Sequence, residues 1–205
     1  MTTFKEMWSE LQRTGKPLPF LLLDCAGIEG GAAQIPRYIF SEIQSLFVGT
    51  LATDLAGVAP YLGQLQSLNA DVARTVENLM KRQAGVLVIP KEKPLGGFDL
   101  SFSQLYRHFR KLNMIEGPGG EKLFFRYYDP RVLTKIVQVF DAAQLDELFG
   151  PVSSFIVIGN ENNMIDLRKG NRLDPPHHFG HATRAADAND GAGFPLRRSA
   201  MTRAR

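Results

Sequence analysis

The stretch Lys-Leu-Phe-Phe-Arg-Tyr-Tyr-Asp-Pro-Arg-Val-Leu, residues 122–133, predicts a strand, a helix cap and a helix in direct succession. Leu123 to Tyr128 is rich in aromatic residues, which favour strands because they pack well on a pleated, half-buried surface. Asp129 and Pro130 then indicate a helix start. An Asp side chain accepts hydrogen bonds from first-turn amides, and proline at the first helical position loses no needed donor. Apolar residues at helical spacing continue that helix: Val132, Leu133, Ile136, Val137 and Phe140.

Patterns along the rest of the chain predict a mixed α/β fold with a central sheet and flanking helices. Short continuous apolar runs are typical of strands that are covered on both faces. Apolar residues at helical spacing indicate helices, and Ser, Thr or Asp followed three residues later by Glu or Gln indicates a capping box. We predict helices over 4–11, 35–47, 72–80, 101–112, 132–140 and 141–149, and strands over 20–23, 61–66, 86–89, 112–116, 122–128, 152–158 and 163–167.

The charge is unevenly distributed along the 205 residues. Of the 24 Lys and Arg residues, seven lie in 169–205, and of the 21 Asp and Glu residues only three do, so the remainder has a net charge of −1. The final segment also lacks periodic apolar residues, and it would bury too little surface to offset about 1–2 kcal/mol of backbone entropy per residue. We therefore predict an α/β domain over 1–168 and a disordered basic tail over 169–205. A nearly neutral domain does not indicate nucleic-acid binding.

Cysteine usage and hydropathy indicate a cytoplasmic protein. The single cysteine, Cys25, excludes an internal disulfide framework and fits a reducing compartment. It follows Asp24, whose carboxylate would raise the thiol pKa, so we expect a small buried residue and not a nucleophile. Residues 1–20 have no signal-peptide pattern, and the apolar runs are too short to cross a bilayer. We expect no membrane partner.

Other residues with chemical potential have simpler structural explanations. His177, His178 and His181 have no predicted helix and no matching Cys or carboxylate, so we predict no metal site. The glycine-rich segment 26–31 lacks the Lys-Ser/Thr of a phosphate-binding loop, and we expect no cofactor. His108 has no accompanying Ser or Cys motif, and we expect a hydrogen-bonded structural residue.

Arg126, Asp129 and Arg131 are the polar residues with the most functional potential. Alternation along the predicted strand would place Arg126 and Tyr128 on one face. An arginine that pairs with Asp129, while Asp129 caps its own helix, would explain these residues without a ligand. Alternatively, Arg131 or Tyr128 also meets a partner, because Tyr and Arg are favoured at binding hot spots. The candidate partner-binding residues are Arg126, Tyr128 and Arg131, together with Arg107 and Arg110 on the exposed side of the 101–112 helix.

Six short motifs occur in an order that resembles one known family. They are Leu-Leu-Leu-Asp at 21–24, Leu-Phe-Val-Gly-Thr at 46–50, Val-Ala-Pro-Tyr-Leu at 58–62, His-Phe-Arg at 108–110, Arg-Tyr-Tyr-Asp-Pro-Arg-Val-Leu at 126–133 and Phe-Gly-Pro-Val at 149–152. Together they resemble the bacterial type VI secretion adaptor family, also called effector chaperones. The resemblance implies a non-enzymatic protein that holds a toxic effector and loads it onto the trimeric spike protein of the secretion machine. That family commonly continues into a helical lobe that helps to grip the cargo.

Two hypotheses of different classes follow. The first is a cytosolic adaptor with an effector and the spike as partners and with no catalytic residues. The second is a small α/β hydrolase or phosphate-ester enzyme that uses Asp24 or Asp129 with Arg126 and Arg131. An enzyme needs convergent carboxylates or an activated nucleophile, and no motif of that kind is present. We favour the adaptor.

Overall fold

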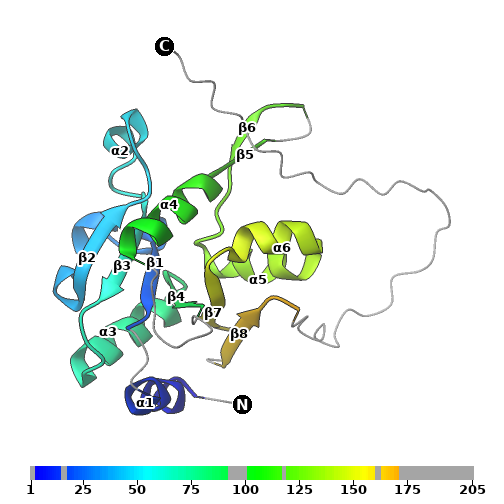
Figure 1. The fold of residues 1–205 in the computed structure, drawn as a ribbon. Coiled ribbons are helices and arrows are strands. Elements are labelled where there is room, and N and C mark those ends of the chain that lie inside the picture. The colour runs from blue at the N-terminus through cyan, green and yellow to red at the C-terminus, as the bar shows by residue number, and fades with distance from the viewer. Residues whose placement is uncertain (1–2, 15–17, 92–100, 117–118, 160–162, 171–205) are drawn as a thin grey trace, which may run out of the picture.

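A six-stranded antiparallel sheet forms the centre of the computed structural model (Figure 1). The structure describes residues 3–14, 18–91, 101–116, 119–159 and 163–170. The strands lie in the order β2 (Phe40–Ser45), β3 (Pro60–Leu65), β1 (Phe20–Asp24), β4 (Gly85–Pro90), β7 (Val152–Ile158) and β8 (Met164–Arg168). The mixed α/β prediction with a central sheet is therefore confirmed. The separate strands β5 (Met114–Glu116) and β6 (Lys122–Phe124) form a two-stranded hairpin.

Helices cover both faces of the sheet, so there are two hydrophobic cores. Successive side chains of a strand point to opposite faces, and in β1 this sends Leu22 to one core and Leu21 and Leu23 to the other. The first core is closed by α4 (Phe102–Leu112), α5 (Pro130–Val139) and α6 (Ala142–Phe149). The second is closed by α1 (Phe4–Thr14) and α3 (Ala70–Lys81). This two-sided cover is why the central strands are continuously apolar.

Local capping sequences start most of these helices where the sequence predicted. Asn69 accepts a hydrogen bond from the Val72 amide at 2.9 Å, at the start of α3. Complete capping boxes precede α4, with Ser101 and Gln104, and α6, with Asp141 and Gln144. These contacts join residues three positions apart, so the local sequence specifies them. The short α2 (Thr50–Asp54) has no side-chain cap.

The helix predicted over 35–47 is wrong. Residues Arg37–Ile39 form a single 3₁₀ turn, and strand β2 follows immediately. The apolar spacing suits a helix, but the segment pairs with β3 instead, and a bulge follows Phe40. The Phe40 ring occupies the space beside Gly63, where an added Cβ would lie 2.4 Å from it. Contacts with a strand some twenty residues away therefore override the local helical pattern.

The strand predicted over 122–128 ends four residues early, at Phe124. The Phe125 amide still donates to the Asn113 carbonyl at 2.9 Å, but the chain then turns into the first core. Phe125, Tyr127 and Tyr128 are all buried, and Arg126 alone remains exposed. The predicted alternation, with Arg126 and Tyr128 on one face, is therefore wrong, because aromatic burial and not strand geometry directs these side chains.

Several predictions lie outside the described residues. These include the three tail histidines and all of the tail beyond Gly170, so the division at 168 stays a prediction. Among the described residues, no helix has an apolar stretch long enough to cross a membrane.

Candidate functional site

The last residue of β1 provides a carboxylate that is completely buried. Asp24 has no exposed surface, and its Oδ1 accepts a hydrogen bond from the Ala26 amide at 3.2 Å. Its own amide donates to the Ala84 carbonyl, next to β4. Asp24 therefore ends a central strand and caps the 3₁₀ turn at Cys25–Gly27. A buried carboxylate at such a position requires a compensating partner.

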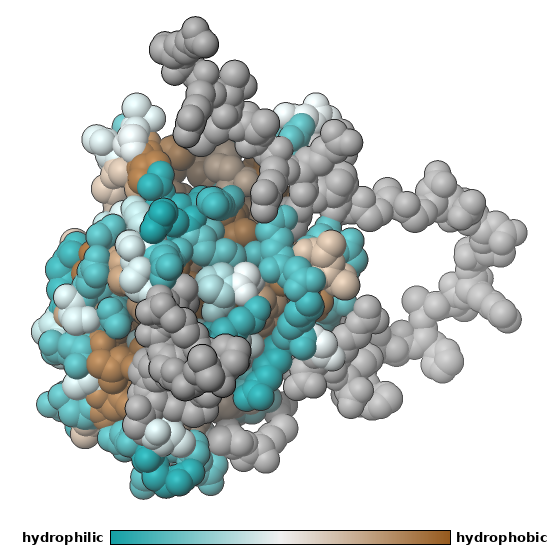
Figure 2. Space-filling view, in the orientation of Figure 1, coloured by the Kyte–Doolittle hydropathy of each residue, from teal (hydrophilic) through white to brown (hydrophobic). Residues whose placement is uncertain are grey.

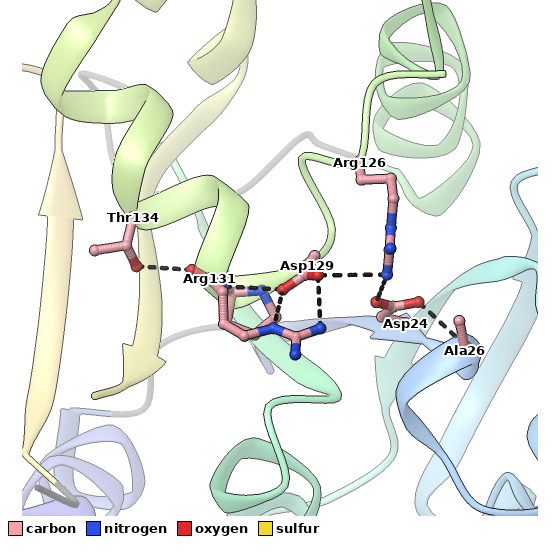
Figure 3. Close-up of polar contacts among 7 residues, drawn as sticks. Asp24, Ala26, Arg126, Asp129, Arg131 and Thr134 are labelled. Carbon is pink, nitrogen blue, oxygen red and sulfur yellow. Dashed lines mark hydrogen bonds and ion pairs between the residues drawn. The ribbon is translucent and has the colours of Figure 1, made fainter. Parts of the chain in front are cut away.

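Arg126 provides that partner and links two distant segments. Its Nη2 lies 2.6 Å from Asp24 Oδ2 and 3.3 Å from Asp129 Oδ2 (Figure 3). The Arg126 side chain is 44% exposed, whereas those of Asp24 and Asp129 are almost fully buried. One guanidinium therefore bridges the end of β1 and the start of α5, and its outer side faces solvent.

Asp129 starts α5, as the sequence predicted, and also binds Arg131. The Arg131 amide donates to Asp129 Oδ1 at 3.0 Å, and Pro130 occupies the first helical position. The Arg131 side chain adds a bidentate pair, with Nε to Oδ1 at 2.9 Å and Nη2 to Oδ2 at 2.8 Å (Figure 3). The charge network, defined as Asp24, Arg126, Asp129 and Arg131, contains two carboxylates and two guanidiniums.

The electrostatics of the network favour the charged forms. Burial opposes ionisation of the Asp129 carboxyl, but the hydrogen bonds from the Arg131 side chain and backbone, together with the charges of Arg131 and Arg126, lower the pKa of Asp129. Burial likewise opposes the charge on Arg126, but the hydrogen bond to Asp24 and the negative charges of Asp24 and Asp129 together raise the pKa of Arg126. Burial, and then the nearby Asp24 charge, raise the pKa of Tyr128 to about 12. Tyr128 is therefore a neutral phenol at physiological pH.

The contacts of the charge network serve mainly to hold parts of the fold together. A general acid needs a carboxyl that keeps its proton near neutral pH, and the lowered pKa of Asp129 is the opposite of that requirement. Both carboxylates accept hydrogen bonds from backbone amides and from guanidinium groups. The arrangement fixes the start of helix α5 against the C-terminal end of the central strand β1, which is the intramolecular explanation that the sequence offered.

The structure separates the predicted partner-binding residues into three groups. Arg126 and Arg131 lie in the network with exposed outer sides. Tyr128 is only 5% exposed, so its ring packs in the core. Arg107 and Arg110 lie elsewhere, exposed on α4. The sequence grouped Asp24 with Arg126 only in the enzyme hypothesis and did not predict a structural ion pair between them. The signal that could have indicated a buried partner for Asp24 was a single carboxylate at the end of an otherwise apolar strand.

Cys25 and His108 have the structural roles expected of them. Cys25 is fully buried, and burial together with the adjacent Asp24 raises the pKa of its thiol to about 12. The His108 ring contacts the Leu148 carbonyl through Nε2 at 3.1 Å, and burial lowers the pKa of His108. The Cys25 thiol is therefore protonated at neutral pH, and the His108 ring is held by the backbone of α6.

A shallow cavity lies apart from the charge network. It has a volume of about 590 Å³ and is lined by residues of the 28–36 segment and of α3, including Thr75 and Asn78, and by Arg82 just after α3. No group of three or more His, Cys, Asp or Glu residues gathers to form a metal site anywhere in the part of the chain that the structure describes.

Comparison with known proteins identifies the family. A family model described as a domain of unknown function (DUF4123) matches residues 19–147, which is more than half of the chain. The chain belongs to the DUF4123 family. The DUF4123 span runs from the start of β1 into α6 and contains the whole charge network, whereas α1, β7 and β8 lie outside it. No curated protein and no solved structure matches the chain at a significant level.

Proposed function

We propose that this DUF4123 protein is a non-enzymatic adaptor that acts in the cytoplasm. It binds a toxic effector and couples it to the spike protein of the type VI secretion machine. The observation that carries the proposal is the family match over 19–147, because the DUF4123 family is generally linked to type VI secretion effector adaptors. Five of the six ordered motifs lie within that span and agree with the match.

The geometry of the charge network is consistent with a binding protein. Its two carboxylates cap turns and hold arginines, so their chemistry is accounted for by the fold. The arginines themselves keep exposed outer sides, and exposed arginine next to a rigid framework is suited to contact with another protein. An adaptor requires such surfaces and requires no assembled nucleophile.

Co-expression with a candidate toxin from the same gene neighbourhood tests the proposal directly. The two proteins should purify together as a stable complex. Deletion of the adaptor gene should abolish delivery of that toxin, while the secretion machine continues to fire and to deliver its other cargo. Full delivery of the toxin by the deletion strain would overturn the proposal.

A catalytic assay tests the non-enzymatic part. The purified protein should show no turnover of ester or phosphate-ester substrates above background. Turnover that Asp24→Ala or Arg131→Ala removes, in variants that still fold, would identify an enzyme instead.

A further inference from the structure

The solvent side of α4 carries three cations. Arg107, Arg110 and Lys111 are exposed, and the helix contains no Asp or Glu. Arg107 Nε donates to the Ser103 carbonyl at 3.1 Å, and the Arg110 guanidinium lies 5.5 Å from the centre of the Tyr106 ring. Among the described residues, none of these three cations forms a salt bridge. Their positive charge is therefore available to a ligand.

Exposed apolar side chains gather beside this helix, on the β5–β6 hairpin. Met114 and Phe124 are directly paired across the hairpin, so their side chains share one face. They are 36% and 48% exposed, and the Phe124 ring lies 5.6 Å from that of Phe47. Val48, next to Phe47, is 43% exposed. Isolated exposed apolar residues are ordinary, but a group of them next to one another indicates an interaction site.

The cations and the apolar group form one surface. Helix α4 runs directly into β5, so Arg110 and Met114 are four positions apart. Tyr106 Oη donates to the Ser45 carbonyl at 2.8 Å, and Asn113 Nδ2 donates to the Leu46 carbonyl at 2.7 Å, which holds the segment before Val48 against the helix. Figure 2 shows brown apolar atoms between α2 and the hairpin, beside teal surface over α4. The α4–hairpin surface is defined as Arg107, Arg110, Lys111, Val48, Met114 and Phe124.

We propose that the α4–hairpin surface binds an acidic, amphipathic segment of the effector. The inference rests on the proposed function, since it names the surface by which such an adaptor holds its cargo. Carboxylates of the segment pair with the α4 cations, and its apolar residues cover Phe124, Met114 and Val48. Aromatic, Met and Arg side chains are enriched in protein interfaces, and this surface contains all three types.

Charge favours an acidic protein segment over three other occupants of the α4–hairpin surface: the chain's own C-terminal residues, a lipid surface and nucleic acid. Residues 171–205 of the chain itself carry more Arg than Asp, and a basic segment is repelled by a basic surface. A lipid surface fits poorly, because the three cations of α4 fall short of the four to eight basic residues typical of lipid-binding clusters. Residues 1–168 as a whole also have a net charge of −1. Nucleic-acid binding likewise requires a more extensive basic surface. An acidic protein segment satisfies both the charge and the apolar part.

Variants of the full chain, purified with the same candidate toxin, test the surface. Arg107→Glu/Arg110→Glu/Lys111→Glu and, separately, Phe124→Ser should each weaken the complex roughly tenfold or more. The control Lys5→Glu/Arg82→Glu/Lys135→Glu changes the net charge equally at exposed positions on α1, after α3 and on α5, and should bind normally. Val139→Ser, at a 76% exposed position, is the apolar control. If the charge reversal lowers the melting temperature, the corresponding Gln variant replaces it.

The outcomes separate the two proposals. A complex that all variants form equally well overturns the α4–hairpin surface and leaves the adaptor function standing. A wild-type protein that binds no toxin overturns the adaptor function, and a peptide assay then decides the surface. A designed helical peptide of Leu and Glu should bind wild type and not the charge-reversed variant, whereas its Leu and Lys counterpart should bind neither.

Three further results, from peptide binding, vesicle sedimentation and measurement of the oligomeric state, would overturn the proposed surface. One is failure of the Leu and Glu peptide to bind. Another is sedimentation of the protein with phosphatidylserine vesicles that the charge reversal abolishes. The third is a dimer of the wild-type protein that Phe124→Ser converts to a monomer, because the surface would then be a contact between two copies of the chain.

Discussion

Asp129 both caps α5 and pairs with two arginines. The cap needs only an oxygen acceptor for the Arg131 amide, which Asn also provides, whereas the pairs with Arg126 and Arg131 need the negative charge. The two contributions are therefore separable by substitution. An aspartate ends strand β1 at Asp24, and another aspartate starts helix α5 at Asp129. Arg126 pairs with both and so connects the two elements.

Replacing Asp129 should therefore have graded effects on stability. Asp129→Ala should lower the free energy of unfolding by about 2 kcal/mol, because it removes the cap and the charge. Asp129→Asn should cost about 1 kcal/mol, because the cap remains and only charge-assisted bonds are lost. Urea unfolding at pH 7 measures both. Equal losses for the two variants would contradict a separate role for the cap.

The pH dependence provides a second check on Asp129. The pKa of its carboxyl is lowered on folding, from an ordinary value of 3.8. The ionised form therefore stabilises the protein above that ordinary value, and the contribution is lost as pH falls through the folded pKa. The stability difference between wild type and Asp129→Asn should shrink below about pH 4. A difference that persists unchanged at pH 3 would argue against a charge effect.

The Asp24–Arg126 pair should show strong coupling. Arg126→Ala leaves the fully buried Asp24 carboxylate without its cation and should cost about 3 kcal/mol. This is the lower end of the range for buried pairs, because Arg126 is half exposed. Asp24→Asn/Arg126→Ala should cost less than the sum of the single changes by about 1 kcal/mol or more. The control Arg168→Ala breaks an exposed pair with Asp166 and should cost less than about 1 kcal/mol. Additive losses at Asp24 and Arg126 would show that the pair does not contribute as a unit.

The junctions between elements depend on glycines in conformations that other residues avoid. Gly150 ends α6 with φ +47° and Gly49 precedes α2 with φ +62°. A Cβ added at Gly150 would lie 2.4 Å from the His108 ring, whereas one added at Gly49 would have no atom within 4 Å. The two positions therefore share backbone strain and differ in crowding.

Alanine substitutions at these glycines should reveal that difference. Gly49→Ala should destabilise the protein by about 1–2 kcal/mol through strain alone. Gly150→Ala should cost about 1 kcal/mol more, because His108 must also move and weaken its contact with the Leu148 carbonyl. Thermal unfolding measures both changes. A smaller loss at Gly150 than at Gly49 would show that His108 moves without cost.

The molecule as a whole is organised by a sheet with a core on each face. Its last strand, β8, is fully paired with β7, and Leu167 is completely buried in the first core. The pairing accounts for every residue of β8 from Met164 to Arg168. The cooperative unit should therefore be complete at the end of β8.

Truncation tests where that unit ends. A chain that stops at Gly170 should melt within about 2 °C of the full chain, which corresponds to less than about 1 kcal/mol. A chain that stops at Asn163 lacks β8 and should melt far lower, because it exposes the first core next to Leu167. Marked destabilisation of the chain that stops at Gly170 would show that the tail packs on the domain.

The sequence by itself determined the elements whose stabilising contacts are local. The caps at Asn69, Ser101, Asp129 and Asp141 bond to amides two or three residues away, so the residue types alone specify them. The buried strands were also predicted, because a strand covered on both faces must be apolar throughout. The short motifs indicated a family, and the DUF4123 match over residues 19–147 covers five of the six.

Only the tertiary structure decided the features that depend on distant contacts. Phe40 lies against Gly63, which makes 40–45 a strand although its spacing suits a helix. Tyr127 stacks on Phe109 and donates to its carbonyl, which draws the chain out of the hairpin after Phe124. Arg126 reaches Asp24 across 102 positions of sequence. Local pattern does not contain these pairings, because the free energy that favours them arises only when separate elements bury one another's side chains.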